Sequence, residues 1–312
     1  MRIKTAFAAG LLSVTPALTG CLVHKHTVLK THPPDVVMNA TLDELLKQTN
    51  DRYRALDSMT LTVQIVACTG GSTQGQVKCY PSFTSYIIID KPEMIRVVLL
   101  IPLLRSRALD MVSNGTNFKM FIPQEHCAIV GSDVSLPSQK GLYSLRPGVI
   151  LDSLLIQGRS DDQVVSMTQD SRVVPNPHKR KDYIQEPDYD IEFLSQPDGS
   201  VARTLRVLHL SRINLLPYRQ DIYNNEGKVQ TYAVYSGYHK YGDIEFPTKI
   251  EMNRPLDELS LTVTVTKATF HQKMNPDEFE LSIPPGTPTQ NMDDPVSAKS
   301  NPCVAHETPP QH

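Results

Sequence analysis

The feature that most constrains this chain is a two-residue alternation of apolar and polar side chains that recurs along its length. The apolar positions of three such runs are Leu61, Val63, Ile65 and Ala67; Phe118, Met120 and Ile122; and Leu261, Val263 and Val265. Successive side chains of a strand point to opposite faces of the sheet, so each run predicts a strand that buries one face.

Tight-turn signals separate these runs. They are Asn114-Gly115, Pro197-Asp198-Gly199, Asn224-Asn225-Glu226-Gly227 and Tyr241-Gly242-Asp243. Short strands joined by such turns are typical of an antiparallel sheet, and we expect about ten or eleven strands. The polar stretch 175–187 is expected to be an exposed loop that divides the strands into two groups.

Two helices are expected beside the sheet. Thr41 and Glu44 have the spacing of a capping box, so a helix should begin there. Its apolar stripe, which needs a hydrophobic surface to cover, consists of Leu42, Leu45, Leu46, Thr49, Tyr53 and Leu56. A shorter helix is expected over 149–156, after Pro147-Gly148. Strands and separate short helices together predict the α+β class.

The first twenty residues have the pattern of an export signal. Arg2 and Lys4 precede an apolar run over 6–14 that is too short to span a bilayer. Residues 18–21, Leu-Thr-Gly-Cys, resemble the lipobox of bacterial lipoproteins, which implies cleavage before Cys21 and acylation of that cysteine, for instance with palmitate. The alternative is an ordinary secretory signal with a structural Cys21.

The remaining chain divides by composition. Residues 21–39 are expected to be a lipidated tether, 40–285 the folded domain, and 286–312 a disordered tail that is rich in Pro, Thr, Asn and Asp. His24 and His26 lie in the tether without a third ligand nearby, so we expect no metal there. Leu22 stands where retention in the inner membrane commonly uses Asp, which favours the outer membrane, facing the periplasm.

Four cysteines remain besides Cys21, and an oxidising compartment favours their pairing. Cys68 and Cys79 flank a Gly-rich polar stretch at the ends of two strand-like runs, so a hairpin would bring them together in a disulfide. Cys127 and Cys303 are the other candidate pair, but the sequence does not place them together.

Charge and motif content exclude several classes of function. With 31 basic and 33 acidic residues the formal net charge is −2, which gives no electrostatic footprint for nucleic acid. Catalytic and cofactor-binding motifs such as GxSxG, HExxH, CxxC and a phosphate-binding glycine loop are absent from the sequence. The nearest approaches to acid–base pairs are 125–126, 161–162 and 188–190. We therefore expect neither an enzyme nor a cofactor.

Three segments, about a third of the chain, resemble the periplasmic lipoprotein carrier LolA and the outer-membrane receptor LolB. They begin LDELLKQTND at residue 42, IIIDKPEMIR at residue 87 and YRQDIYNNEG at residue 218. The resemblance implies a strongly curved antiparallel sheet that forms an incomplete β-barrel, lidded by short helices, with an apolar concavity for acyl chains. The apolar inward positions would fill a packed core equally well.

Anchored members of that family carry an apolar loop between their third and fourth strands. The matching residues here are Leu99, Leu100, Ile101, Pro102, Leu103 and Leu104. Proline cannot donate to a sheet ladder, so the chain should turn there and contact a membrane or an acyl chain, or pack as a buried strand end. The expected function is to bind or transfer a lipophilic group, such as the acyl chains of other lipoproteins; the alternative is a structural or interaction lipoprotein with a filled core.

Overall fold

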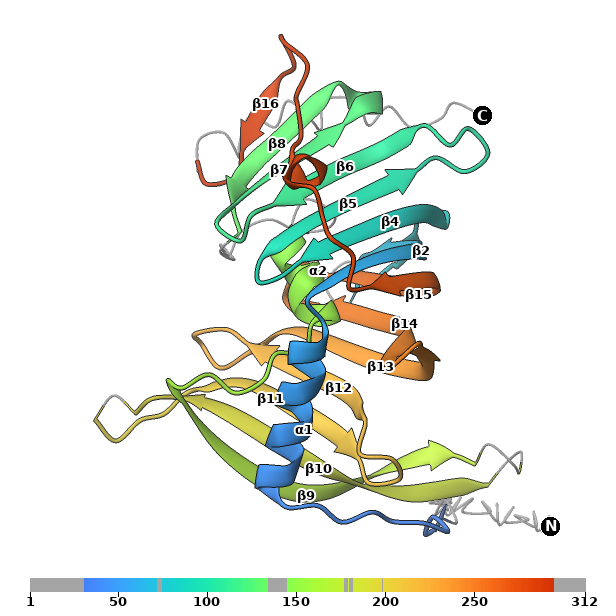
Figure 1. The fold of residues 1–312 in the computed structure, drawn as a ribbon, viewed down its shortest axis with the longest axis vertical. Helices are drawn as coiled ribbons and strands as arrows, with labels where there is room; N and C mark the ends of the chain where they lie inside the picture. Colours follow the sequence, from blue (N-terminus) through green and yellow to red (C-terminus); the bar gives the residue numbers. More distant parts are fainter. Residues whose placement is uncertain are drawn as a thin grey trace, which may run out of the picture.

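A computed structural model describes residues 31–71, 75–133, 145–176, 179, 182–197 and 199–294. Within them, one 16-stranded sheet curves through the whole molecule (Figure 1). Its main path runs β1-β10-β11-β12-β13-β14-β15-β2-β4-β5-β6-β7-β8-β16, with β3 paired to β2 and β9 paired to β10. The sheet therefore starts at β1 and stops at β16 without closing.

The strands of the N-terminal half are β1 Thr31–His32, β2 Ser58–Thr69, β3 Lys78–Cys79, β4 Phe83–Asp90, β5 Met94–Leu100, β6 Arg107–Ser113, β7 Asn117–Ile122 and β8 Cys127–Ser132. Those of the C-terminal half are β9 Gln163–Pro175, β10 Tyr183–Ser195, β11 Thr204–Ser211, β12 Pro217–Tyr223, β13 Val229–Tyr241, β14 Ile244–Arg254, β15 Leu259–Phe270 and β16 Thr289–Asn291. The helices are α1 Leu42–Ala55 and α2 Pro147–Leu154, with 3-10 turns at Pro123–Glu125, Pro255–Asp257 and Pro276–Phe279.

The predicted large, curved, unclosed sheet is confirmed, but the described residues are mostly strand with two α-helices, and they differ from the prediction in two further respects. The described residues contain sixteen strands rather than about ten or eleven, because short strands such as β1, β3 and β16 lack an alternation long enough to detect. Neighbouring strands are antiparallel except for two short pairings, β1 with β10 and β16 with β8, which are parallel. The turn signals at 114–115, 224–227 and 241–243 each join consecutive strands.

Helix α1 forms for the reasons that its sequence indicates. Thr41 is its N-cap, and the Thr41 hydroxyl and the Glu44 carboxylate each accept the other residue's backbone N–H. Leu45 and Thr49 on the apolar stripe are buried. In Figure 1 the helix crosses the lower part of the sheet, in front of β10 to β12, and its C-terminal end leads up into β2.

Two apolar clusters hold the sheet and helices together. The larger one fills the concave side of the β2–β8 and β13–β15 region and includes Ile150, Leu151, Leu154 and Leu155 at α2. The smaller one packs Leu45 of α1 against β10 and β11 through Ile191, Phe193 and Leu208. The second helix was expected at 149–156, and α2 occupies 147–154.

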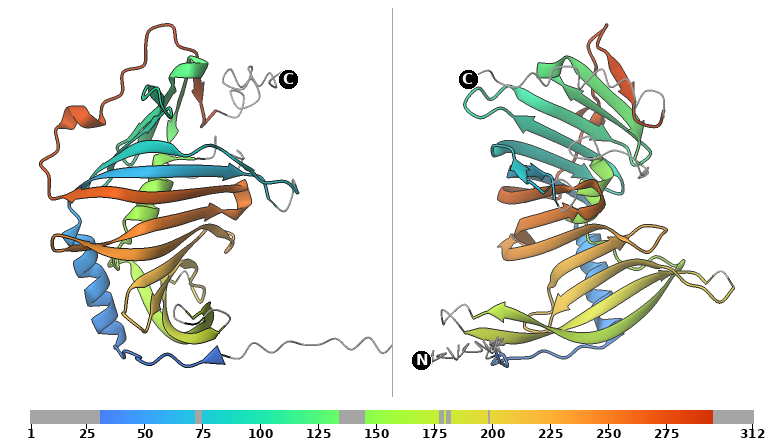
Figure 2. Two further views of the ribbon diagram at one scale, coloured as in Figure 1. Left: turned by 90° about the vertical axis from the view of Figure 1, so that its right-hand side faces the viewer. Right: turned by 180° about the vertical axis from the view of Figure 1, so that it is seen from behind.

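The loop expected at 175–187 is shorter than predicted. β9 and β10 pair from Gln163 opposite Ser195 to Pro175 opposite Tyr183, which makes one long hairpin. The sequence did not indicate these strands because Pro175, Pro187 and a polar composition obscure the alternation, and because the side chains of β9 lie largely outside the core. Figure 2 shows how strongly this hairpin curves.

The boundaries of the tether and tail also differ from expectation. Within the expected tether, β1 pairs with β10, and Met38 N–H donates to the Arg212 carbonyl oxygen at 2.6 Å. Residues 286–294, expected to begin the disordered tail, include β16 and bury Gln290 and Met292. The expected signal peptide, Cys21, His24, His26 and Cys303 lie outside the described residues. Among the residues that are described, no helix is both long and apolar enough to cross a membrane.

Candidate functional site

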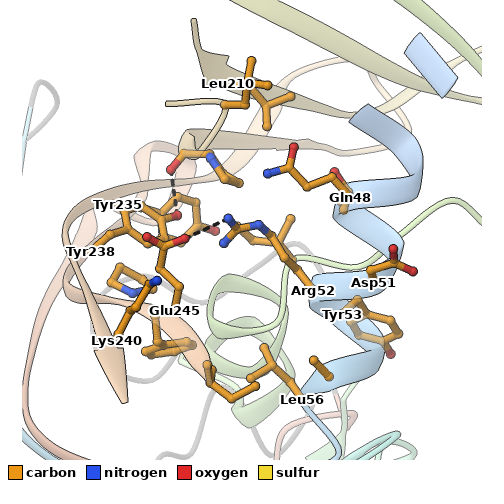
Figure 3. A pocket seen from close by; sticks show the side chains of 18 of the residues that line it. Gln48, Asp51, Arg52, Tyr53, Leu56, Leu210, Tyr235, Tyr238, Lys240 and Glu245 are labelled. Atoms are coloured by element: carbon orange, nitrogen blue, oxygen red, sulfur yellow. Dashed lines mark hydrogen bonds and ion pairs between the residues drawn. The ribbon is translucent and has the colours of Figure 1, made fainter. Parts of the chain in front are cut away.

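A cavity of about 680 Å³ lies between α1 and the C-terminal part of the sheet (Figure 3). Its walls come from α1, the C-terminal end of α2 and strands β11 to β14. The apolar residues that line it are Tyr53, Ala55, Leu56, Leu154, Ile156, Leu210, Leu215, Pro217, Tyr235, Tyr238, Ile244, Phe246 and Pro247. This volume is within the usual range of small-molecule sites, roughly 300–1,000 Å³.

Two local features of the sequence build the cavity. The stripe on α1 continues past Leu45 and Thr49 to Tyr53 and Leu56, which turn toward the sheet near the end of the helix. On the opposite side, β13 and β14 form a hairpin whose turn contains Gly242 at a φ of 69°, a conformation that suits glycine. The hairpin places aromatic side chains across from the helix.

The two tyrosines that β13 contributes to the wall, Tyr235 and Tyr238, present apolar ring surface because their hydroxyls are already bonded. The Tyr235 hydroxyl donates to the Ser153 carbonyl oxygen at 3.0 Å, and the Tyr238 hydroxyl donates to the Pro217 carbonyl oxygen at 2.7 Å. Burial raises the pKa of both phenols above the usual value, so both stay neutral. The wall therefore suits an apolar occupant.

Polar groups surround the mouth of the cavity. Arg52 of α1 forms an ion pair with Glu245 of β14 at 2.9 Å, and their side chains are 31% and 32% exposed. Figure 3 shows Arg52 reaching from the helix to Glu245 across the cavity, with Gln48 one turn earlier. At this exposure the pair contributes little to stability, about 1 kcal/mol or less.

A second, smaller cavity of about 170 Å³ is polar and lies against β11 and β12. Burial, aided by the charge of Asp133, raises the pKa of the Asp152 carboxyl to about 6. Burial lowers the pKa of Arg206 to about 10, and this guanidinium donates to the carbonyl oxygens of Gln157 and Gly158 at 2.6 and 2.7 Å. Arg206 thereby holds the segment after α2 against the sheet.

The predicted apolar loop divides into a packed base and an exposed tip. Leu99, Leu100 and Ile101 are half-buried at the end of β5. Pro102, Leu103 and Leu104 form the turn to β6, where Leu103 is 101% and Leu104 75% exposed. The turn lies at the right-hand edge of the sheet in Figure 1, away from the cavity under α1.

The cysteines are placed as follows. Cys68 and Cys79 are opposite each other in β2 and β3 and are joined by a disulfide with a sulfur–sulfur distance of 2.04 Å. Cys127 is buried in β8, and its suggested partner Cys303 lies outside the described residues.

One ionic cluster was not foreseen from the sequence. His209 of β11 lies between two carboxylates, with Nδ1 2.6 Å from Asp190 and Nε2 3.5 Å from Asp221. Burial would lower the pKa of His209, but the hydrogen bonds to Asp190 and Asp221 raise it to about 9. The cluster lines neither cavity, and no group of three or more His, Cys, Asp or Glu in the described part of the chain is placed to hold a metal ion.

Comparisons with known proteins give distant matches. No protein-family model and no curated protein matches the chain. A crystal structure of a LolA superfamily protein from Nitrosomonas europaea is 15% identical and has a TM-score of 0.47, covering 78% of this chain and 99% of that one.

A crystal structure described as a putative outer membrane lipoprotein-sorting protein domain from Vibrio parahaemolyticus is 9% identical and has a TM-score of 0.46, covering 76% of this chain and 95% of that one. Both likenesses are too distant to assign an activity to this chain.

Proposed function

We propose that this protein is a lipid-anchored component of the cell envelope that binds a lipophilic group in the cavity under α1. The observation that carries the proposal is the cavity itself, whose walls are mainly apolar and in which the hydroxyls of Tyr235 and Tyr238 are already hydrogen-bonded. The proposed occupant is an acyl chain, such as one carried by another lipoprotein. Each methylene that the cavity removes from water contributes about 0.8 kcal/mol.

The rim suits an occupant with a polar end. Arg52 and Glu245 are partly exposed at the mouth, and Gln48 and Lys240 also line it. A chain inserted between α1 and the β13–β14 hairpin would leave its head group among these side chains. Catalysis is not part of the proposal, which is one of binding or transfer.

The proposed location is the periplasmic face of the outer membrane. Acylated Cys21 would anchor the protein, and the exposed tip formed by Leu103 and Leu104 would contact lipid. An exposed pair of leucines at a turn is typical of a contact site rather than of a folding element.

A second candidate function is supported by the packing on the concave side of the sheet. The large apolar cluster and α2 fill the region between β2 and β8, which is what a structural or interaction lipoprotein would show. Under that alternative the cavity under α1 would stay empty of lipid.

Uptake of an acyl probe distinguishes the two. Delipidated protein is titrated with a fluorescent fatty acid, and saturable binding is expected. Ile156→Trp, which adds bulk to the cavity wall, should weaken binding at least tenfold, whereas Val201→Trp, at a 61% exposed site outside the cavity, should leave it unchanged. Absence of saturable uptake by the wild-type protein would favour the structural alternative.

A further inference from the structure

Among the described residues, the longest regular hairpin is β9–β10, and one edge of β9 is unprotected. β9 has 13 residues, and its pairing with β10 runs without a bulge over the whole strand. In the described residues no strand pairs with the other side of β9. Proteins usually shorten, bulge or cover such edges, because the free backbone groups can pair with another chain.

The backbone groups on this edge point outward at odd-numbered residues. Gln163 donates its N–H to the Ser160 carbonyl oxygen at 3.1 Å, outside the ladder, while Ser195 opposite it donates to the Arg203 carbonyl oxygen at 2.8 Å. In an antiparallel ladder the direction of these groups alternates from one residue to the next. Odd-numbered residues of β9 therefore direct N–H and C=O away from β10.

A second pair of opposite residues shows the same outward direction of backbone groups at odd-numbered positions of β9. Pro187, opposite Ser171, has no N–H, and its carbonyl oxygen accepts from Arg212 N–H at 3.0 Å on the far side of β10. Ser171 N–H instead donates to the Asp170 carboxylate at 2.7 Å. Gln169, at the centre of the strand, shares this parity and so has outward-facing N–H and C=O groups.

The residue types along β9 are arranged nearly symmetrically on the two sides of Gln169. Residues 164–174 read VVSMTQDSRVV, with a valine pair at each end. If a second copy of the strand lies antiparallel with Gln169 opposite Gln169, Val165 falls opposite Val173 and Val164 opposite Val174. Opposite residues of an antiparallel pair share one face, so these valines would be in contact.

Pairing two copies of β9 with Gln169 opposite Gln169 would also bury apolar surface, and it would place no two like charges directly opposite each other. Val173 is 51% and Val164 39% exposed in the single chain. Asp170 would lie opposite Thr168, and Arg172 opposite Ser166, so no two like charges are directly opposite.

We propose that β9 is an interface for a second copy of this chain, which joins two sheets edge to edge about a two-fold axis at Gln169. The symmetry of the strand favours a second copy over an unrelated peptide, because a two-fold interface requires a surface complementary to itself. The proposal is independent of the cavity and of its occupant.

Disulfide trapping in membranes from cells that express the full chain tests the register. With Gln169→Cys, the two sulfur-bearing residues would have Cα atoms about 5.5 Å apart, within reach of a disulfide. Ser166→Cys is the matched control, since residue 166 of the second copy would be about 20 Å away. Oxidation should therefore link Gln169→Cys into a dimer much more efficiently than Ser166→Cys.

Sedimentation of the full chain in detergent provides the second measurement. The wild-type protein should sediment at twice the mass of one chain. Gln169→Pro removes an outward N–H without touching the β9–β10 ladder, so it should give a monomer with an unchanged melting temperature. Gln169→Ala loses the same contact with Arg212 but keeps the N–H, and should stay dimeric.

Three outcomes overturn the proposal. They are a wild-type protein that is monomeric at every concentration, equal cross-linking of the two cysteine variants, and a Gln169→Cys adduct whose mass corresponds to a different protein.

Discussion

The substitution Leu103→Glu separates a membrane contact from a folding element. The Leu103 side chain is 101% exposed at the turn between β5 and β6, and its backbone has a φ of 68°. A carboxylate there meets water in the folded and in the unfolded protein alike. The free energy of unfolding should therefore change by less than about 0.5 kcal/mol.

Membrane binding should respond much more strongly. A leucine that moves from water into the apolar part of a bilayer gains about 1.5–3 kcal/mol, and a glutamate loses that gain. Since 1.4 kcal/mol corresponds to a factor of ten, the apparent affinity for lipid should fall about 10- to 100-fold. Leu104, which is 75% exposed beside it, would retain part of the contact.

The assay is sedimentation of the protein with lipid vesicles, using chain that lacks residues 1–21 so that the acyl anchor does not mask the tip. Val201→Glu, at a 61% exposed site on another loop, is the control for added negative charge. Vesicle binding that survives Leu103→Glu, or a melting temperature that falls by more than a few degrees, would remove this loop from the proposed function.

Three further predictions concern the anchor, the disulfide and a buried acid. Cys21→Ala should abolish lipid labelling and leave an unprocessed or mislocalised precursor, whereas the wild type, with Leu22 after the cysteine, should fractionate with outer membranes. Replacing Cys68 and Cys79 by serine should lower the free energy of unfolding by about 3 kcal/mol without altering lipid labelling, measured by denaturant titration. Asp152, whose pKa is about 6, binds a proton in the folded state that the unfolded chain releases nearer pH 4, so stability is lost as the pH rises through this window. Asp152→Asn should thus exceed the wild type in stability by up to about 3 kcal/mol at pH 7 and match it at pH 4, and equal curves at both pH values would count against this account.

Local patterns predicted a good part of this fold. The capping box at Thr41 and Glu44 and the apolar stripe after it gave α1 nearly to the residue, because both act within one or two helical turns. Alternation identified the core of β2 and β15, whose inward side chains are indeed buried. The turn at Pro102 also follows from a local rule, the inability of proline to continue a strand, whereas the sequence left open whether Leu103 is exposed or buried.

The cavity and the ionic cluster could not be predicted in the same way. Tyr53, Ile156 and Tyr238 come from three distant segments, and their proximity depends on how the sheet curves and where α1 crosses it. His209 meets Asp190 and Asp221 only through the register of β10, β11 and β12, which sequence alone leaves open. Residues 188–190, which the sequence offers as a possible acid–base cluster, a polar strand end or a loop, lie within the long strand β10.

The pairing of β2 with β15 imposes an order on folding. Ser58–Thr69 and Leu259–Phe270 lie side by side in the centre of the sheet, although about two hundred residues separate them in the chain. The strand series β4–β8 and β10–β14 can form hairpins from segments that are near each other in the chain. The pairing of β2 with β15, which joins the two halves of the sheet, can form only after β15 has been synthesised. Contacts between such distant segments are slow to form. Until then β2 and β14 each present a row of unpaired backbone groups beside apolar side chains, so a chain that stops before Leu259 should aggregate rather than fold.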